Sequence, residues 1–170
     1  MAMTLLLGGA RSGKSARALR LAHDWEGQVV FVATGEDRDP EMAARIARHR
    51  LERPASWRTV EAPIELARAF DSIPAHAFVI LDCLTLWVAN TLEAGWSDEE
   101  VERAGAAVAT IAAAREQPTV VVSNEVGLGL VPQTPLGRNY RDLLGRVNAV
   151  FAAEADEAYL MVAGRLLQLT

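Results

Sequence analysis

The sequence predicts an α/β fold in which a mainly parallel central sheet is flanked by helices and carries an antiparallel hairpin at its C-terminal edge. Short apolar runs alternate with stretches of helical periodicity, and a glycine-rich turn separates the first run from the first helical stretch. The main strands are expected at residues 4–7, 29–33, 78–81, 119–122 and 159–162. The helices are expected at residues 15–23, 40–51, 64–70, 84–92, 98–115 and 136–153.

The first strand, the turn and the first helix together predict a phosphate-binding loop. The turn matches the pattern G-x-x-x-x-G-K-[ST] with Gly8, Gly9, Ala10, Arg11, Ser12, Gly13, Lys14 and Ser15. In such a loop, backbone N–H groups and the helix dipole attract phosphates, and the Ser15 hydroxyl binds Mg²⁺. The pattern indicates a P-loop NTPase that binds a nucleoside triphosphate; the alternative is an ordinary glycine-rich turn.

Lys14 strengthens this prediction because it is the only lysine among seventeen basic residues. The remaining basic residues are all arginine, so the chain uses lysine only where the phosphate loop requires it. A compact ammonium on a thin stem reaches between phosphates, where a broad guanidinium would not fit.

Later elements carry boundary signals of their own. Helix 40–51 is expected to begin at Pro40 behind an Asp39 cap and to end before Pro54. A short additional strand is expected at 57–60, leading to a loop at Glu61. The last main strand is expected to fold back through residues 163–165 into an antiparallel strand at 166–169.

Composition narrows the class of protein. The 170 residues contain no evident linker or repeat, so residues 1–170 are expected to form a single domain. A net charge of −5 argues against a general nucleic-acid binder. The single cysteine excludes an internal disulfide and fits a reducing cytoplasm. Asp82 interrupts the longest apolar stretch, 77–89, so no membrane span and a cytoplasmic protein are expected.

A second group of polar residues lies in the stretch 45–58, which contains His49 and five arginines. The arginines are Arg45, Arg48, Arg50, Arg53 and Arg58. Met42, Ile46 and His49 follow helical spacing, which places the imidazole at the edge of the inward face. Neighbouring cations disfavour the imidazolium form, so His49 could be a nucleophile toward phosphorus. The alternative is a solvated basic helix with a histidine packed at its margin.

Two acids and one loop complete the candidates from the residues alone. Asp82 ends the apolar run 78–81, where P-loop proteins keep a carboxylate that supports the metal; the alternative is a strand-end or helix-capping role. Glu61 by itself reads as an exposed acid. The glycine-containing segment 123–132 follows a strand at the edge of the sheet where ligands bind. Cys83, His23 and His76 show no metal-ligand spacing.

Several segments form a distinctive combination that covers nearly the whole chain. They are residues 8–15, 41–46 leading to His49, 53–59, 124–127, 131–132, 141–142 and 145–148. In these segments the sequence resembles the family of bifunctional adenosylcobinamide kinases and adenosylcobinamide-phosphate guanylyltransferases of cobalamin biosynthesis.

The resemblance implies a RecA-like P-loop fold, a homotrimer and two reactions. ATP or GTP phosphorylates the aminopropanol hydroxyl of adenosylcobinamide. GTP then donates GMP to that phosphate through a GMP-histidine intermediate and releases pyrophosphate. The histidine of the intermediate corresponds to His49, and Arg48 stands where some members have another histidine.

The resemblance also implies nucleotide contacts beyond the phosphate loop. They correspond to Thr34, Gly35, Glu36, Arg50, Leu51, Glu52, Arg53, Glu61 and Asp82. Some members have glutamate in place of Asp82, so the shorter side chain leaves its role as base or metal ligand open. The expected catalytic residues are His49, Lys14 and Asp82, with Ser15 and Asp82 serving Mg²⁺.

Three other functions remain as alternatives at the level of sequence. The first is a GTPase switch, although the chain has neither an N-K-x-D motif nor a D-x-x-G motif after the third strand. The second is a plain small-molecule P-loop kinase in which His49 is structural. The third is a nucleotide-binding regulatory subunit without catalysis.

Overall fold

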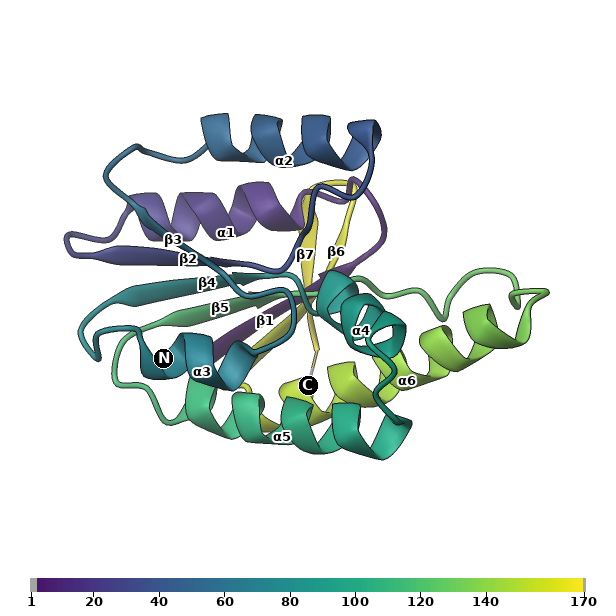
Figure 1. Cartoon of the computed structure of the whole chain (residues 1–170). Coiled ribbons are helices and arrows are strands. Elements are labelled where there is room, and N and C mark those ends of the chain that lie inside the picture. Colours follow the sequence, from purple (N-terminus) through teal and green to yellow (C-terminus); the bar gives the residue numbers. More distant parts are fainter. Residues whose placement is uncertain (1–2, 170) are drawn as a thin grey trace.

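The computed structural model describes residues 3–169, which form one seven-stranded sheet with helices on both faces (Figure 1). The strands are β1 (Met3–Gly8), β2 (Val29–Ala33), β3 (Arg58–Glu61), β4 (Phe78–Asp82), β5 (Thr119–Val122), β6 (Glu157–Val162) and β7 (Arg165–Leu169). The helices are α1 (Lys14–His23), α2 (Pro40–Leu51), α3 (Leu66–Asp71), α4 (Leu84–Glu93), α5 (Asp98–Ala113) and α6 (Pro135–Glu154). The predicted fold class is confirmed, and every predicted element is present with ends shifted by at most a few residues.

The sheet has the strand order β3-β2-β4-β5-β1-β6-β7. All neighbouring pairs are parallel except β6 and β7, which form the predicted antiparallel edge hairpin. Its turn places Ala163 and Gly164 at positive φ. At the opposite edge, β3 runs one residue further than predicted, so Glu61 ends the strand and pairs in register with Ala33.

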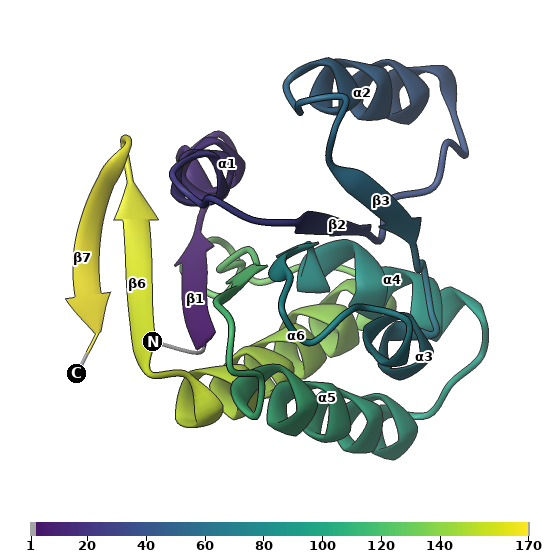
Figure 2. The same cartoon turned by 90° about the vertical axis from the view of Figure 1, so that its left-hand side faces the viewer.

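Helices α1 and α2 lie on one face of the sheet, and α3, α4, α5 and α6 lie on the other (Figure 2). The larger core joins the second group of helices to the sheet through side chains such as Trp87, Leu144 and Phe151. The smaller core packs Ala18, Leu19 and Ala22 of α1 against the opposite face. Apolar side chains therefore cover both faces of the central strands, as expected of a parallel sheet.

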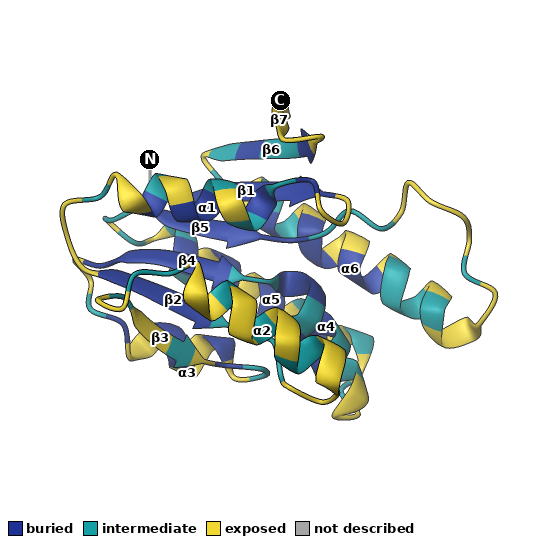
Figure 3. Ribbon diagram, turned by 90° about the horizontal axis from the view of Figure 1, so that it is seen from above, coloured by how far each residue is buried: buried dark blue, intermediate teal, exposed yellow. Residues whose placement is uncertain are grey.

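Helix α2 differs from the others because none of its residues is buried (Figure 3). Its start is nevertheless well specified: Pro40 occupies the first turn, and the Asp39 side chain accepts a hydrogen bond from the Met42 backbone N at 2.8 Å. The predicted cap is confirmed. Because so little apolar surface holds α2, its position depends on polar contacts at its C-terminal end.

Within residues 3–169, no helix has both the length and the apolar character needed to cross a bilayer.

Candidate functional site

The phosphate-binding loop connects β1 to α1 with backbone geometry that requires glycine at two positions. Gly8 has φ +150° and Gly13 has φ +100°, a region that disfavours side chains. A Cβ atom on Gly8 would also lie 2.4 Å from the Met161 carbonyl oxygen of β6. The loop is thus packed between its own helix and a strand from the C-terminal part of the chain.

Lys14 is buried within this loop. Its Nζ donates hydrogen bonds to the carbonyl oxygens of Gly8 at 2.8 Å and Gly9 at 2.7 Å, and to Ser12 Oγ at 3.3 Å. Burial lowers the pKa of Lys14, and Cys83 and Asp82 oppose that shift. The ammonium is held at the loop by neutral acceptors, which anionic phosphate oxygens can replace to form stronger bonds.

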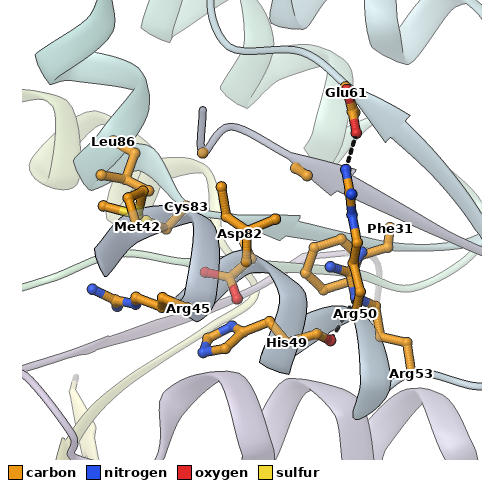
Figure 4. Close-up of a pocket in the computed structure, with 13 residues that line it drawn as sticks. Phe31, Met42, Arg45, His49, Arg50, Arg53, Glu61, Asp82, Cys83 and Leu86 are labelled. Carbon is orange, nitrogen blue, oxygen red and sulfur yellow. Dashed lines mark hydrogen bonds and ion pairs between the residues drawn. The ribbon is translucent and has the colours of Figure 1, made fainter. Parts of the chain in front are cut away.

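A pocket opens beside the loop between α2 and the carboxyl ends of β2 and β4 (Figure 4). Its lining comprises Phe31, Ala33, Gly35, Met42, Arg45, Ile46, His49, Arg50, Arg53, Glu61, Asp82, Cys83 and Leu86. The predicted inward stripe of Met42, Ile46 and His49 is therefore the pocket-facing side of α2. Figure 4 shows the Asp82 carboxylate facing His49 and Arg45. A nucleophile candidate, a carboxylate and a guanidinium converge on one space.

Asp82 is the last residue of β4, in register with Ala33 on β2 and Val122 on β5. The following helix α4 has Cys83 as its N-cap and no side-chain cap hydrogen bond. Asp82 therefore does not cap helix α4. The Asp82 carboxylate lines the pocket, and its negative charge opposes the lowering of the Lys14 pKa.

Arg53 fastens the C-terminal end of α2. Its guanidinium carbon lies 3.8 Å from the centre of the Phe31 ring, and its Nε donates to the His49 carbonyl oxygen at 2.9 Å. A further bond runs from Nη1 to Thr59 Oγ1 at 3.2 Å. Burial lowers the pKa of Arg53, with Asp82 opposing. These contacts make Arg53 the residue that holds the His49 backbone against the sheet.

The other pocket arginines differ in their partners. Arg50 forms an ion pair with Glu61, which joins α2 to β3. Arg45 has no ion pair within residues 3–169, so its guanidinium is free to receive an anion in the pocket.

The remaining residues implied by the resemblance lie outside the lining of this pocket, apart from Gly35. Thr34 is fully buried, and its Oγ1 donates to the Cys83 carbonyl oxygen and accepts from the Cys83 N, both at 2.8 Å. Glu36 forms an ion pair with Arg38. Leu51 is 88% exposed, and Glu52 is the C-cap of α2.

Sequence reasoning missed residues that organise the site without a motif. Phe31 reads as one more apolar residue of β2 but forms the platform for Arg53. Thr85, at the start of α4, accepts from the Asn124 N at 2.8 Å, and its carbonyl oxygen accepts from the Tyr140 hydroxyl at 3.1 Å. Burial raises the pKa of Tyr140 to about 12, so it stays a hydrogen-bond donor. No local pattern marks such contacts, because each joins segments far apart in the sequence.

Comparison with known proteins identifies relatives of this chain. The family model described as cobinamide kinase / cobinamide phosphate guanyltransferase matches residues 4–169. The chain is 42% identical to the bifunctional adenosylcobalamin biosynthesis protein CobU of Escherichia coli (strain K12), covering 95% of this chain and 96% of that protein. It is 42% identical to the corresponding protein CobP of Pseudomonas aeruginosa, covering 94% and 92%.

Solved structures with little sequence identity share the fold. A KaiC-like protein from Pyrococcus horikoshii aligns with a TM-score of 0.54 at 13% identity, covering 94% of this chain and 70% of that one. An ATPase from a type III secretion system aligns with a TM-score of 0.58 at 9% identity, covering 94% and 50%. These similarities show that the chain shares the fold of those proteins. The family match over residues 4–169 and the 42% identity to CobU and CobP identify the chain as a member of the cobinamide kinase / cobinamide phosphate guanyltransferase family.

Proposed function

We propose that one domain, residues 1–170, phosphorylates adenosylcobinamide with ATP or GTP and then transfers GMP from GTP to the new phosphate. The observation that carries the proposal is the convergence of His49, Asp82 and Arg45 on a pocket beside the phosphate loop. A plain kinase needs the loop but has no use for a histidine on a helix held at that pocket by an arginine.

The kinase step relies on the loop and its neighbours. Lys14 exchanges the loop carbonyls for phosphate oxygens and stabilises the charge of the transferring group. The oxygen donors of Ser15 and Asp82 suit Mg²⁺, which prefers oxygen ligands. When bound, the ion neutralises charge on the phosphates, while the loop amides orient them.

The guanylyl step uses His49 as the nucleophile. An imidazole nitrogen attacks the α-phosphorus of GTP, a nitrogen–phosphorus bond forms, the bond to the bridging oxygen breaks, and pyrophosphate leaves. The phosphate of the phosphorylated acceptor then attacks the same phosphorus and releases the imidazole. Arg45 supports the charge that develops on the phosphate oxygens, and Arg53 keeps His49 in place.

Labelled GTP separates this proposal from the alternatives. With α-labelled GTP, the wild type should acquire a covalent label that is stable in alkali and lost in acid, as expected of a phosphoramidate. His49→Ala should lose the label while still phosphorylating adenosylcobinamide from γ-labelled GTP. His23→Ala is the control, because His23 packs on Trp57 outside the pocket lining. If His49→Ala still acquires the covalent label, or if the wild type never acquires it, the result would favour the plain kinase.

A homotrimer is the proposed assembly. Support comes from large apolar side chains that solvent reaches on the loop before α6 and at its start, which extend away from the sheet (Figure 1). They are Leu128, Leu130, Val131 and Leu136, and Leu130 is 97% exposed. Exposed apolar clusters of this kind commonly mark association surfaces. Sedimentation velocity should give a trimer that Leu130→Asp with Leu136→Asp dissociates; a monomeric wild type contradicts the assembly.

A further inference from the structure

A second pocket lies between the segment after β5 and one face of α6. Glu125, Gly127, Arg141, Gly145 and Asn148 are among its lining residues. None of these side chains has a part in the two steps described above.

One lining residue of this pocket, Glu125, is hydrogen-bonded to the phosphate loop through its backbone. The Gly8 carbonyl oxygen accepts hydrogen bonds from both Lys14 Nζ, at 2.8 Å, and the Glu125 N, at 3.2 Å. One oxygen atom therefore lies between the phosphate-binding ammonium and the backbone of Glu125. Because β5 lies between β4 and β1 in the sheet, its carboxyl end also stands between Asp82 and the loop. The lining of this pocket therefore starts at the same edge of the sheet as the phosphate loop and Asp82.

A hydrogen bond from the Gly127 backbone fixes the orientation of the Glu125 carboxylate. Its Oε1 accepts a hydrogen bond from the Gly127 N at 2.5 Å, and Oε2 has no hydrogen-bond partner among residues 3–169. At this edge of the sheet Glu61 pairs with Arg50, and the Asp82 carboxylate faces His49 in the first pocket. Glu125 thus offers a free carboxylate oxygen next to the phosphate loop.

The pocket lining contains two polar side chains of α6, Asn148 and Arg141. Asn148 is 5% exposed; its Nδ2 donates to the Asn124 carbonyl oxygen at 3.0 Å, while its Oδ1 has no partner within the described chain. Arg141 pairs only with its neighbour Asp142, at 3.0 Å, a weak contact that a ligand can replace. Arg141 therefore gives this wall a cation that a polar ligand can contact.

We propose that this pocket holds the hydroxyl-bearing arm of the acceptor during phosphoryl transfer, and that Glu125 takes the proton of that hydroxyl. The inference rests on the proposed kinase function. The acceptor oxygen bonds to the γ-phosphorus, the bond from that phosphorus to the β–γ bridging oxygen breaks, and the diphosphate leaves with that oxygen. The proton passes to Glu125, which is partly exposed and returns it to water.

Formation of the GMP-enzyme needs GTP and His49 but no acceptor, so it reports on folding and GTP binding independently. Glu125→Gln should reduce kcat for phosphorylation of adenosylcobinamide by about 100-fold or more, the usual effect of losing a general base. Labelling by α-labelled GTP should be unchanged. Glu154→Gln, on the exposed last turn of α6, is the matched control and should leave both activities unaltered.

Two further variants test the geometry. A Cβ atom at Gly127 would lie 2.8 Å from Glu125 Oε1, so Gly127→Ala should displace the carboxylate and reduce kcat without removing the acid. Gly145 has open space around its Cβ position and lines the pocket, so Gly145→Trp should fill it. We expect at least a tenfold rise in the KM for adenosylcobinamide with an unchanged KM for GTP.

A Glu125→Gln enzyme with wild-type kcat overturns the inference, as does one that also loses GMP labelling, because Glu125 would then act through the GTP site. An unchanged acceptor KM in Gly145→Trp overturns the location. A wild type that lacks kinase activity instead refutes the proposed function.

Discussion

Replacing Arg53 with methionine should loosen α2 and with it His49. The substitution removes the guanidinium but retains an unbranched side chain of similar reach over Phe31. It deletes the bond to the His49 carbonyl oxygen, the bond to Thr59 and the cation–π contact. Because α2 has no buried residue, few other contacts compensate.

The size of the effect follows from these three contacts. The half-buried bond to the His49 carbonyl oxygen contributes about 1 kcal/mol, and the exposed bond to Thr59 contributes less. The contact with the Phe31 ring contributes about 0.5–1 kcal/mol. The free energy that docks α2 should fall by about 1.5–2.5 kcal/mol, so the undocked population rises about 10–70-fold.

Hydrogen exchange followed by mass spectrometry measures this population directly. Backbone amides of α2 should exchange about 10–70-fold faster in Arg53→Met, while those of β5 stay protected. Arg48→Met is the matched control on the same helix, since Arg48 is exposed and has no ion pair or side-chain hydrogen bond within residues 3–169. Equal exchange in Arg53→Met and Arg48→Met would refute the assignment of Arg53 as the anchor of α2.

Other predictions concern the phosphate loop and its surroundings. Lys14→Arg should abolish or severely weaken GTP binding despite the retained charge, because the guanidinium cannot occupy the buried position among the loop carbonyls; wild-type affinity by calorimetry would contradict this. Asp82→Asn should lower Mg²⁺-dependent turnover more than GTP affinity, and an unchanged rate across a Mg²⁺ titration argues against a metal-supporting role. Burial raises the pKa of the Cys83 thiol from 9.0 to about 11, so less thiolate is present in the folded protein at pH 8. Alkylation by iodoacetamide at pH 8 should be about 100-fold slower in the folded chain than in the denatured chain, and equal rates would refute that environment.

Much of the fold follows from local sequence patterns. The apolar runs locate the central strands because both faces of a parallel sheet are covered, which leaves little ambiguity in the pattern. The hairpin at the C-terminal edge follows from Gly164, which adopts the positive φ that its turn requires. The sequence pattern predicts the end of β3 one residue early, because Glu61 is polar and a strand pattern does not reveal its ion pair with Arg50.

The phosphate loop and the pocket-facing stripe of α2 follow from sequence patterns, because each depends on residues close together in the chain. The completion of the two pockets depends instead on contacts between segments far apart in the sequence. Arg53 anchors α2 by packing on Phe31. The backbone of Glu125 is held by the carbonyl oxygen of Gly8, which is more than one hundred positions away in the sequence. Such contacts depend on strand order and register, and these result from the packing of the whole sheet rather than from any local spacing.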